Sequence, residues 1–138
     1  MRTEGEILQL VYDIVKGSAL YSFIHQHGGE VFKKRRPIHR EGKMDVVIAV
    51  LAGTNGKLQS FSVNVNVYYR DINSNGEFFE DTALSKEVQR QCADLFEHID
   101  RNEYFISYAA GSVPKTFALE DTHEHFVRNE ILITIQNF

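Results

Sequence analysis

The chain has 138 residues and a mass of 15.9 kDa, and its net charge is −4 at pH 7. This length suits one domain, and a composition of 43% hydrophobic and 25% charged residues excludes disordered, collagen-like and disulfide-stapled chains. A domain of this size buries enough surface to fold without a metal or a disulfide. We therefore expect residues 1–138 to form a single domain.

Charge is segregated along the chain. Residues 33–43 contain six basic residues and one acid, a local charge of +5, whereas residues 71–100 contain eight acids and two bases, a local charge of −6. The negative overall balance argues against a dedicated nucleic-acid binder. Opposite charges on separate faces instead favour head-to-tail contacts between copies of the chain.

The chain carries no sign of export or of membrane insertion. Its one cysteine, Cys92, excludes an internal disulfide and favours a reducing compartment. No apolar run reaches the roughly 18 residues of a membrane span, and the first ten residues lack the apolar core of a signal peptide. We expect a cytoplasmic protein with no membrane partner.

The first half of the chain predicts one helix and three strands. Residues 3–17 form the helix, which Thr3 and Glu6 begin as a capping box and Gly17 ends. Residues 18–27 are apolar but short and stay unassigned. The strands are expected at residues 30–36, 44–51 and 58–69, the last two joined by an Asn-Gly turn at 55–56.

The second half predicts one helix and three further strands. After a loop at 71–80, a helix capped by Asp81 or Thr82 spans residues 82–99. Its buried stripe is formed by Leu84, Val88, Cys92, Leu95, Phe96 and Ile99. The strands are expected at 103–110, 114–120 and 125–137. The order of helix, three strands, helix and three strands predicts an α+β fold, with two helices packed on an antiparallel or mixed sheet.

Two H-x-H pairs are the candidates for a metal site. They are His25 and His27, and His123 and His125. On a strand this spacing places both rings on one face, where zinc could bind them together with Asp121 or Glu124. An isolated H-x-H pair is a weak signal, so we favour surface histidines and no metal or other cofactor. A small metal-dependent enzyme or ligand-binding module that uses these histidines is the alternative function.

No motif in the chain demands catalysis. Cys92 lies on the apolar stripe of the second helix, where a free cysteine is usually a small buried hydrophobe rather than a nucleophile. The glycines form no phosphate-binding loop, and no serine lies in a nucleophile elbow. The sequence therefore predicts a protein without catalytic residues.

The basic run leaves three alternatives open. It comprises Lys33, Lys34, Arg35 and Arg36. A solvated edge strand, a charged subunit contact with the acidic helix and, below both, a contact with nucleic acid would each explain it. For the subunit contact, the acidic candidates are Glu87, Asp94 and Glu97. For contact with a partner, the candidates in the 71–80 loop are Asn73, Asn75, Gly76, Phe78 and Phe79.

Four stretches of the chain together resemble a family. They are GGEVFKKRRP at 28–37, MDVVIAVL at 44–51, LQSFSVNVNVYYRDI at 58–72 and HEHFVRNEILITI at 123–135. In this order they resemble small prophage proteins of Bacteroides-type genomes, which are similar to the tail-completion, or tail-terminator, proteins of long-tailed phages. These motifs are packing patterns rather than catalytic ones.

The resemblance implies an α+β subunit of a virion-assembly ring, commonly a hexamer. Such a ring sits on the end of the tail tube, stops its growth and joins it to the head connector, without catalysing a reaction. The implied partners are further copies of the chain and a tail-tube or neck protein. The resemblance also leaves open a head-tail connector role, in which the subunit acts by ring assembly in the same way.

Overall fold

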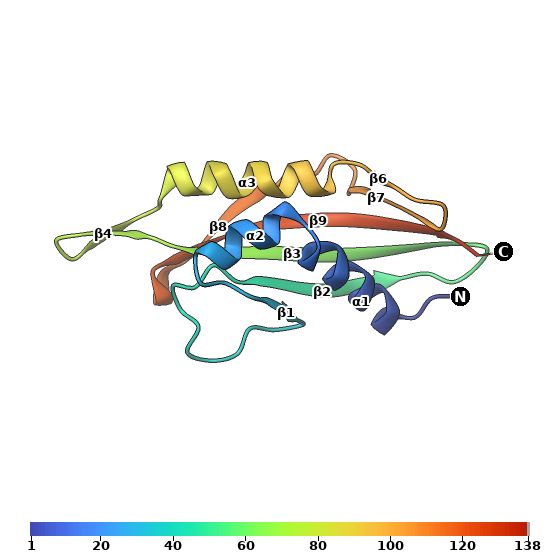
Figure 1. Cartoon of the computed structure of the whole chain (residues 1–138), viewed down its shortest axis with the longest axis horizontal. Coiled ribbons are helices and arrows are strands. Elements are labelled where there is room, and N and C mark those ends of the chain that lie inside the picture. Colours follow the sequence, from blue (N-terminus) through green and yellow to red (C-terminus); the bar gives the residue numbers. More distant parts are fainter. Residues whose placement is uncertain (138) are drawn as a thin grey trace.

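The computed structural model describes residues 1–137 as one layer of strands with three α-helices packed on one of its faces (Figure 1). The helices are α1 (Glu4–Lys16), α2 (Ala19–Gln26) and α3 (Thr82–Phe96). The first strands are β1 (Val31–Lys33), β2 (Val46–Gly53), β3 (Leu58–Arg70), β4 (Ile72–Ser74) and β5 (Glu77–Phe79). The remaining strands are β6 (Ile99–Asp100), β7 (Tyr104–Tyr108), β8 (Lys115–Leu119) and β9 (Glu124–Gln136), the last preceded by a 3₁₀ turn at Glu120–Thr122. The expected α+β class is confirmed.

The main sheet is mixed and is built around two long strands. Its order is β1-β2-β3-β9-β7-β6, and β8 also pairs with β9. Because β8 pairs with residues 124–128 of β9 and β7 with residues 131–135, these two strands lie one after the other along the same side of β9. Among the strands of residues 1–137, only β1 runs parallel to its neighbour, β2. A separate hairpin, β4–β5, forms the second sheet.

The core lies between the sheet and the helices. Alternate residues of β3, among them Phe61, Val65 and Tyr69, are buried, and Val65 lies opposite the buried Asn129 of β9. The residues between them, such as Ser62 and Asn66, face the other side of the sheet, away from the three described helices. This is the two-residue period that the sequence predicts for half-buried strands.

Several predicted boundaries are confirmed by cap geometry. Thr3 and Glu6 form the capping box of α1, and Gly17 ends that helix. The side chain of Asp81 accepts a hydrogen bond from the Leu84 backbone N–H and caps α3. Cys92 is fully buried on the inner face of α3, as its position in the apolar stripe predicts.

Two predicted helix regions differ from the structure. The unassigned residues 18–27 form α2, which Ser18 caps and which buries Leu20 and Ile24, one turn apart. Helix α3 ends at Phe96 instead of at residue 99, and the buried Ile99 pairs with Ile106 as part of β6. Ile99 is therefore a core residue, but it reaches the core from a strand.

The predicted strand at 30–36 and the loop at 71–80 also differ. Strand β1 ends at Lys33 because Lys34 adopts a φ of 70°, which breaks the extended backbone. The segment after Asp71 is a hairpin whose Asn75-Gly76 turn has positive φ at both residues, the geometry of a tight two-residue hairpin turn. Figure 1 shows this hairpin extending beyond the rest of the molecule.

Candidate interaction surfaces

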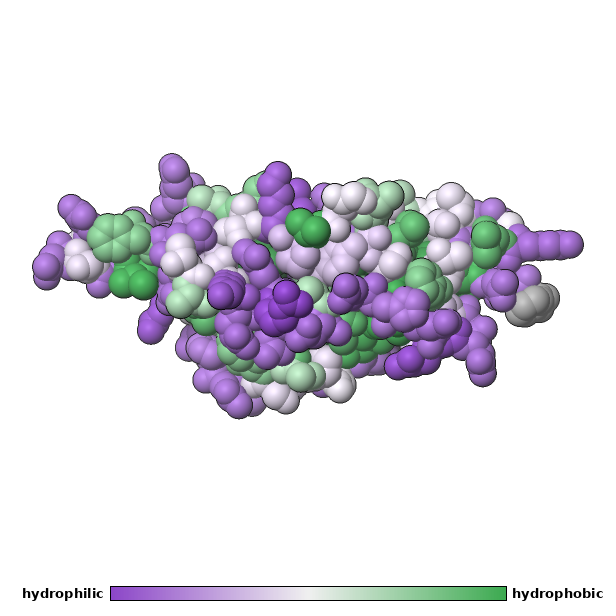
Figure 2. Space-filling model, turned by 90° about the horizontal axis from the view of Figure 1, so that it is seen from above, coloured by the Kyte–Doolittle hydropathy of each residue, from purple (hydrophilic) through white to green (hydrophobic). Residues whose placement is uncertain are grey.

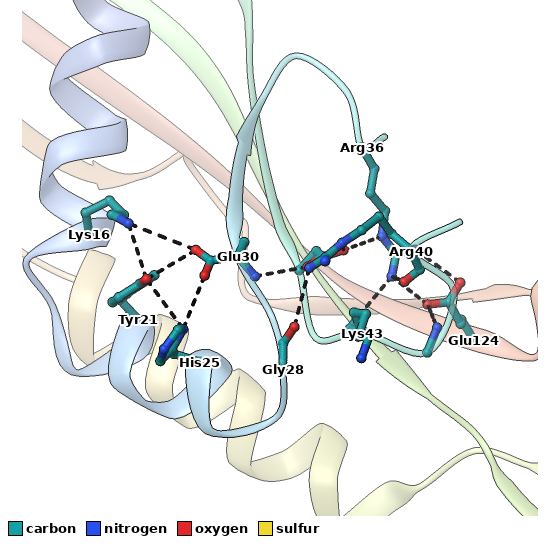
Figure 3. A network of polar contacts seen from close by, with 11 residues as sticks. Lys16, Tyr21, His25, Gly28, Glu30, Arg36, Arg40, Lys43 and Glu124 are labelled. Carbon is teal, nitrogen blue, oxygen red and sulfur yellow. Dashed lines mark hydrogen bonds and ion pairs between the residues drawn. The ribbon is translucent and has the colours of Figure 1, made fainter. Parts of the chain in front are cut away.

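A buried ion network anchors the segment between β1 and β2. We call residues 34–45 the basic loop. The guanidinium of Arg36 donates from Nε to Asp45 at 2.9 Å and from both Nη atoms to Glu124 at 2.8 and 3.1 Å. The side chains of both acids are completely buried, and that of Arg36 is 14% exposed. Arg36 therefore ties this loop to the start of β9 (Figure 3).

Further hydrogen bonds complete this network. Arg36 donates to the backbone carbonyls of Arg40 and Lys43 at 2.8 Å, and Arg40 donates to both carboxylate oxygens of Asp45. Burial by itself raises the pKa of Asp45, but the hydrogen bonds from Arg40 and Arg36 outweigh it and hold that pKa below its usual range. The loop is thus folded around an ionised carboxylate.

The network continues to the helices. The backbone N–H of Glu30 donates to Asp45 at 3.0 Å, and the carboxylate of Glu30 accepts from Tyr21 of α2 at 3.2 Å. His25 lies 3.3 Å from the same carboxylate, and Lys16 lies 4.0 Å from it (Figure 3). Polar contacts therefore link α1 and α2 to the loop and to β9.

These contacts divide the predicted basic run into internal and outward residues. Arg36, a candidate for subunit contact, is used inside the chain. Lys33 donates to Gln9 and lies 4.9 Å from the ring centroid of Tyr12. Within residues 1–137, Lys34 and Arg35 are exposed and have no ion-pair partner, and the nearby Ile38 is 82% exposed. The loop therefore presents the free cations Lys34 and Arg35 close to one large apolar side chain, and a third cation unpaired within the described residues, Lys43, near its other end.

The β4–β5 hairpin forms the second outward surface. All residues from Ile72 to Phe79 are exposed, and Ile72, Phe78 and Phe79 present large apolar side chains that are 48%, 40% and 48% exposed. Phe78 stacks on the ring of His123 at a centroid distance of 3.7 Å. The partner-contact candidates Asn73, Asn75, Gly76, Phe78 and Phe79 all lie on this hairpin.

The outer face of α3 carries both signs of charge. Glu87 accepts a hydrogen bond from Gln91, and Asp94 forms an exposed 3.4 Å ion pair with Arg90. Glu97, the C-cap of the helix, is exposed. The three acidic candidates do lie outward, but Lys86 and Arg90 alternate with them.

The histidine pairs do not come together as two-ligand sites. His25 and His27 lie at the end of α2, not on a strand, and residues two apart on a helix do not share a face. His123 ends the 3₁₀ turn at a φ of 55°, whereas His125 is hydrogen-bonded through Nδ1 to Asp71 at 2.6 Å. Within residues 1–137, no group of three or more His, Cys, Asp and Glu side chains is placed to hold a metal ion.

One member of each pair borders the same cleft at the base of the hairpin. This open cleft of about 770 Å³ is lined by His27 and His123, and by Asp71, Asp81 and Phe78. Its lining carries both signs of charge and is open to solvent. Because Ile72 and Phe78 line one part of it and Glu41 another, the cleft lies between the hairpin and the basic loop.

The uncovered face of the sheet holds a group of aromatic and arginine side chains that sequence reasoning missed. Tyr68 and Phe126 lie opposite each other on β3 and β9, and Phe117 of β8 stacks against Phe126. The guanidinium of Arg36 lies 4.4 Å from the Tyr68 ring centroid, and that of Arg128 lies 4.6 Å from that of Phe117. A signal existed for Tyr68, since the pair Tyr68-Tyr69 in one strand must place one ring outside the core, whereas Phe117 and Phe126 have no Phe or Tyr neighbour in the sequence.

Comparisons of the chain with protein-family models and with curated protein sequences gave no match. Within residues 1–137, no single helix has the length and apolar composition to cross a membrane; α1 and α2 meet that criterion only as a pair, which is bent by 71°.

Proposed function

We propose that the chain is a non-enzymatic subunit of a phage-like tail. In this proposal it acts as a tail-completion or tail-terminator protein, or as a related head-tail connector, by forming a homo-oligomeric ring that contacts a tail-tube or neck protein. The setting is the cytoplasm of a cell that carries the prophage. The single observation that carries the proposal is the charge segregation of the chain on one α+β body, with exposed cations at residues 34–35 and an excess of acids in residues 71–100.

The four stretches that carry the resemblance support the proposal at the level of the fold. They form β1 and the adjacent strands β2, β3 and β9, which are the centre of the sheet. The second glycine of the first stretch, Gly29, lies where a Cβ atom would be 1.7 Å from the carbonyl oxygen of Met44. The residues that carry the resemblance thus include positions that packing constrains.

Complementary surfaces on one chain have a consequence for assembly. When the two surfaces are different patches, each copy can use one patch on each of two neighbours, and such head-to-tail contacts close into a ring if the rotation between copies allows it. A ring is the form that a protein needs in order to cap a cylindrical tube. In this proposal Lys34 and Arg35 belong to the basic patch, and the free end of the hairpin faces either a neighbour or the tube.

The test is assembly on a tail tube. Purified protein is mixed with the polymerising tail-tube protein of the same genome, and the products are observed by negative-stain electron microscopy. We expect shorter tubes with a ring at one end, and we expect a Lys34→Glu/Arg35→Glu variant to lose the effect. Tubes of unchanged length with bare ends would contradict the proposal.

A further inference from the structure

The β4–β5 hairpin carries large exposed apolar side chains and makes few contacts with the rest of the chain. An isolated two-stranded hairpin is at best marginally stable in water, and here all residues from 72 to 79 are exposed. Apart from the stacking of Phe78 on His123, its large side chains face solvent. Figure 2 shows apolar atoms among hydrophilic ones at the end of the molecule that β4 occupies in Figure 1. Contiguous exposed apolar side chains of this kind mark an interaction site.

The hairpin and its flanks are the most acidic part of the chain. Residues 71–81 contain four acids and no base. Asp71 is paired with His125, and Glu80 accepts a hydrogen bond from Tyr69, but Glu77 lies beside the turn and has no ion-pair partner within residues 1–137. A partner for this surface must combine apolar area with positive charge.

The basic loop combines apolar area with positive charge. Its exposed residues include the unpaired cations Lys34 and Arg35 and the protruding side chain of Ile38. The bonds of Arg36 and Arg40 to Asp45 order the loop, and the bonds of Arg36 to the buried Glu124 fix it to β9, so these groups are presented by an ordered segment. Little conformational entropy is then lost when a partner binds.

We propose that the hairpin of one copy docks on the basic loop of a second copy, with Phe79 against Ile38 and Glu77 beside Lys34 and Arg35. The hairpin fits this role better than α3, because Lys86 and Arg90 interrupt the acids of that helix. Because the contact joins two different segments, each copy can engage one neighbour through its hairpin and another through its basic loop, which is the head-to-tail arrangement that we propose. This inference rests on the proposed self-assembly and names the segments that carry it.

Cysteine cross-linking between two labelled chains tests the contact. Ile38→Cys chains are mixed with size-tagged Ser74→Cys chains, whose cysteine lies at the end of β4, and mild oxidation follows. In a matched mixture, the tagged chain carries Gln91→Cys on α3 instead. The native Cys92 is fully buried, so it stays out of the reaction. We expect the hairpin mixture to form heterodimers roughly tenfold faster than the helix mixture, because docked cysteines react at a high effective concentration.

Charge reversal provides the second readout, measured as self-association by sedimentation. Arg35→Glu and Glu77→Lys should each weaken association roughly tenfold, since each places like charges at the contact. Both changes in one chain should restore it, and Glu87→Lys on α3 should leave it unchanged.

The outcomes separate this contact from the proposed function. Faster cross-linking through Gln91→Cys, together with weakening by Glu87→Lys, would overturn the hairpin contact and leave ring assembly through α3. A parent protein that stays monomeric, or equal cross-linking in both mixtures, would also overturn the contact. The tube-capping experiment then decides the function independently.

Discussion

Removing the guanidinium of Arg36 should destabilise the domain far more than removing the exposed guanidinium of the adjacent Arg35. In Arg36→Ala, Asp45 keeps its bonds from Arg40, but Glu124 keeps only the backbone N–H of Gly42 at 3.0 Å. The Glu124 side chain is completely buried. Leaving one partner of a buried ion pair without the other costs about 3–5 kcal/mol. That is a large part of the roughly 5–15 kcal/mol by which domains are stable.

The assay is urea unfolding at pH 7, followed by far-UV circular dichroism or tyrosine fluorescence because the chain has no tryptophan. Arg35→Ala is the matched control, and we expect it to change the free energy of unfolding by about 0.5 kcal/mol or less, as for most exposed sites. An Arg36→Met/Glu124→Leu variant, which removes both charges, should recover most of the loss. If Arg36→Ala and Arg35→Ala were equally stable, the buried network would not hold the loop as we argue.

Three further predictions follow from single residues. The pKa of Asp45 is lower in the folded state than its ordinary value of 3.8, so the ionised carboxylate stabilises the fold fully above that value and this contribution is lost as the pH falls through the folded pKa. When the free energy of unfolding is measured against pH, its decrease below about pH 4 should therefore be shallower for Asp45→Asn than for the parent protein. Gly29→Ala should lower the free energy of unfolding in urea by about 3 kcal/mol or more, since its Cβ would collide with the backbone of Met44. The control Gly5→Ala, in the open first turn of α1, should leave this free energy unchanged or raise it. Equal effects of the two substitutions would contradict the collision at Gly29. Burial raises the pKa of the Cys92 thiol to about 12, so at pH 8 Ellman's reagent should react with this thiol only after the protein unfolds, and rapid reaction of the native protein would contradict this.

Local patterns in the sequence predicted most of the fold. Thr3 with Glu6 gave the start of α1, and the alternation along residues 58–69 gave β3 and its buried face. Such features depend on residues a few positions apart, which the sequence displays directly. Helix α2 was missed because an eight-residue helix between a serine cap and glycines offers too few turns for a periodic pattern. The hairpin was missed because neither of its strands is half-buried, so neither alternates.

The basic run shows why the surfaces were harder to predict than the fold. Four consecutive cations give no local sign of which one folds inward. Arg36 is internal because Asp45 and Glu124, 9 and 88 residues away, meet beside it in the folded chain. A usable signal lay with the acids instead. Asp45 stands at the head of the apolar stretch MDVVIAVL, and a charge next to a buried strand needs a partner of opposite sign.

The buried position of Arg36 also limits what the resemblance can indicate there. The Arg36-Pro37 pair is part of the GGEVFKKRRP stretch, and its arginine holds the loop to β9 rather than facing a neighbour. The resemblance at Arg36 therefore bears on the packing of the fold and not on assembly. Evidence about assembly must come from the outward residues of the same loop, Lys34 and Arg35, whose charge the fold does not use. Charge reversal at these two positions therefore tests the function, whereas substitution of Arg36 tests the fold.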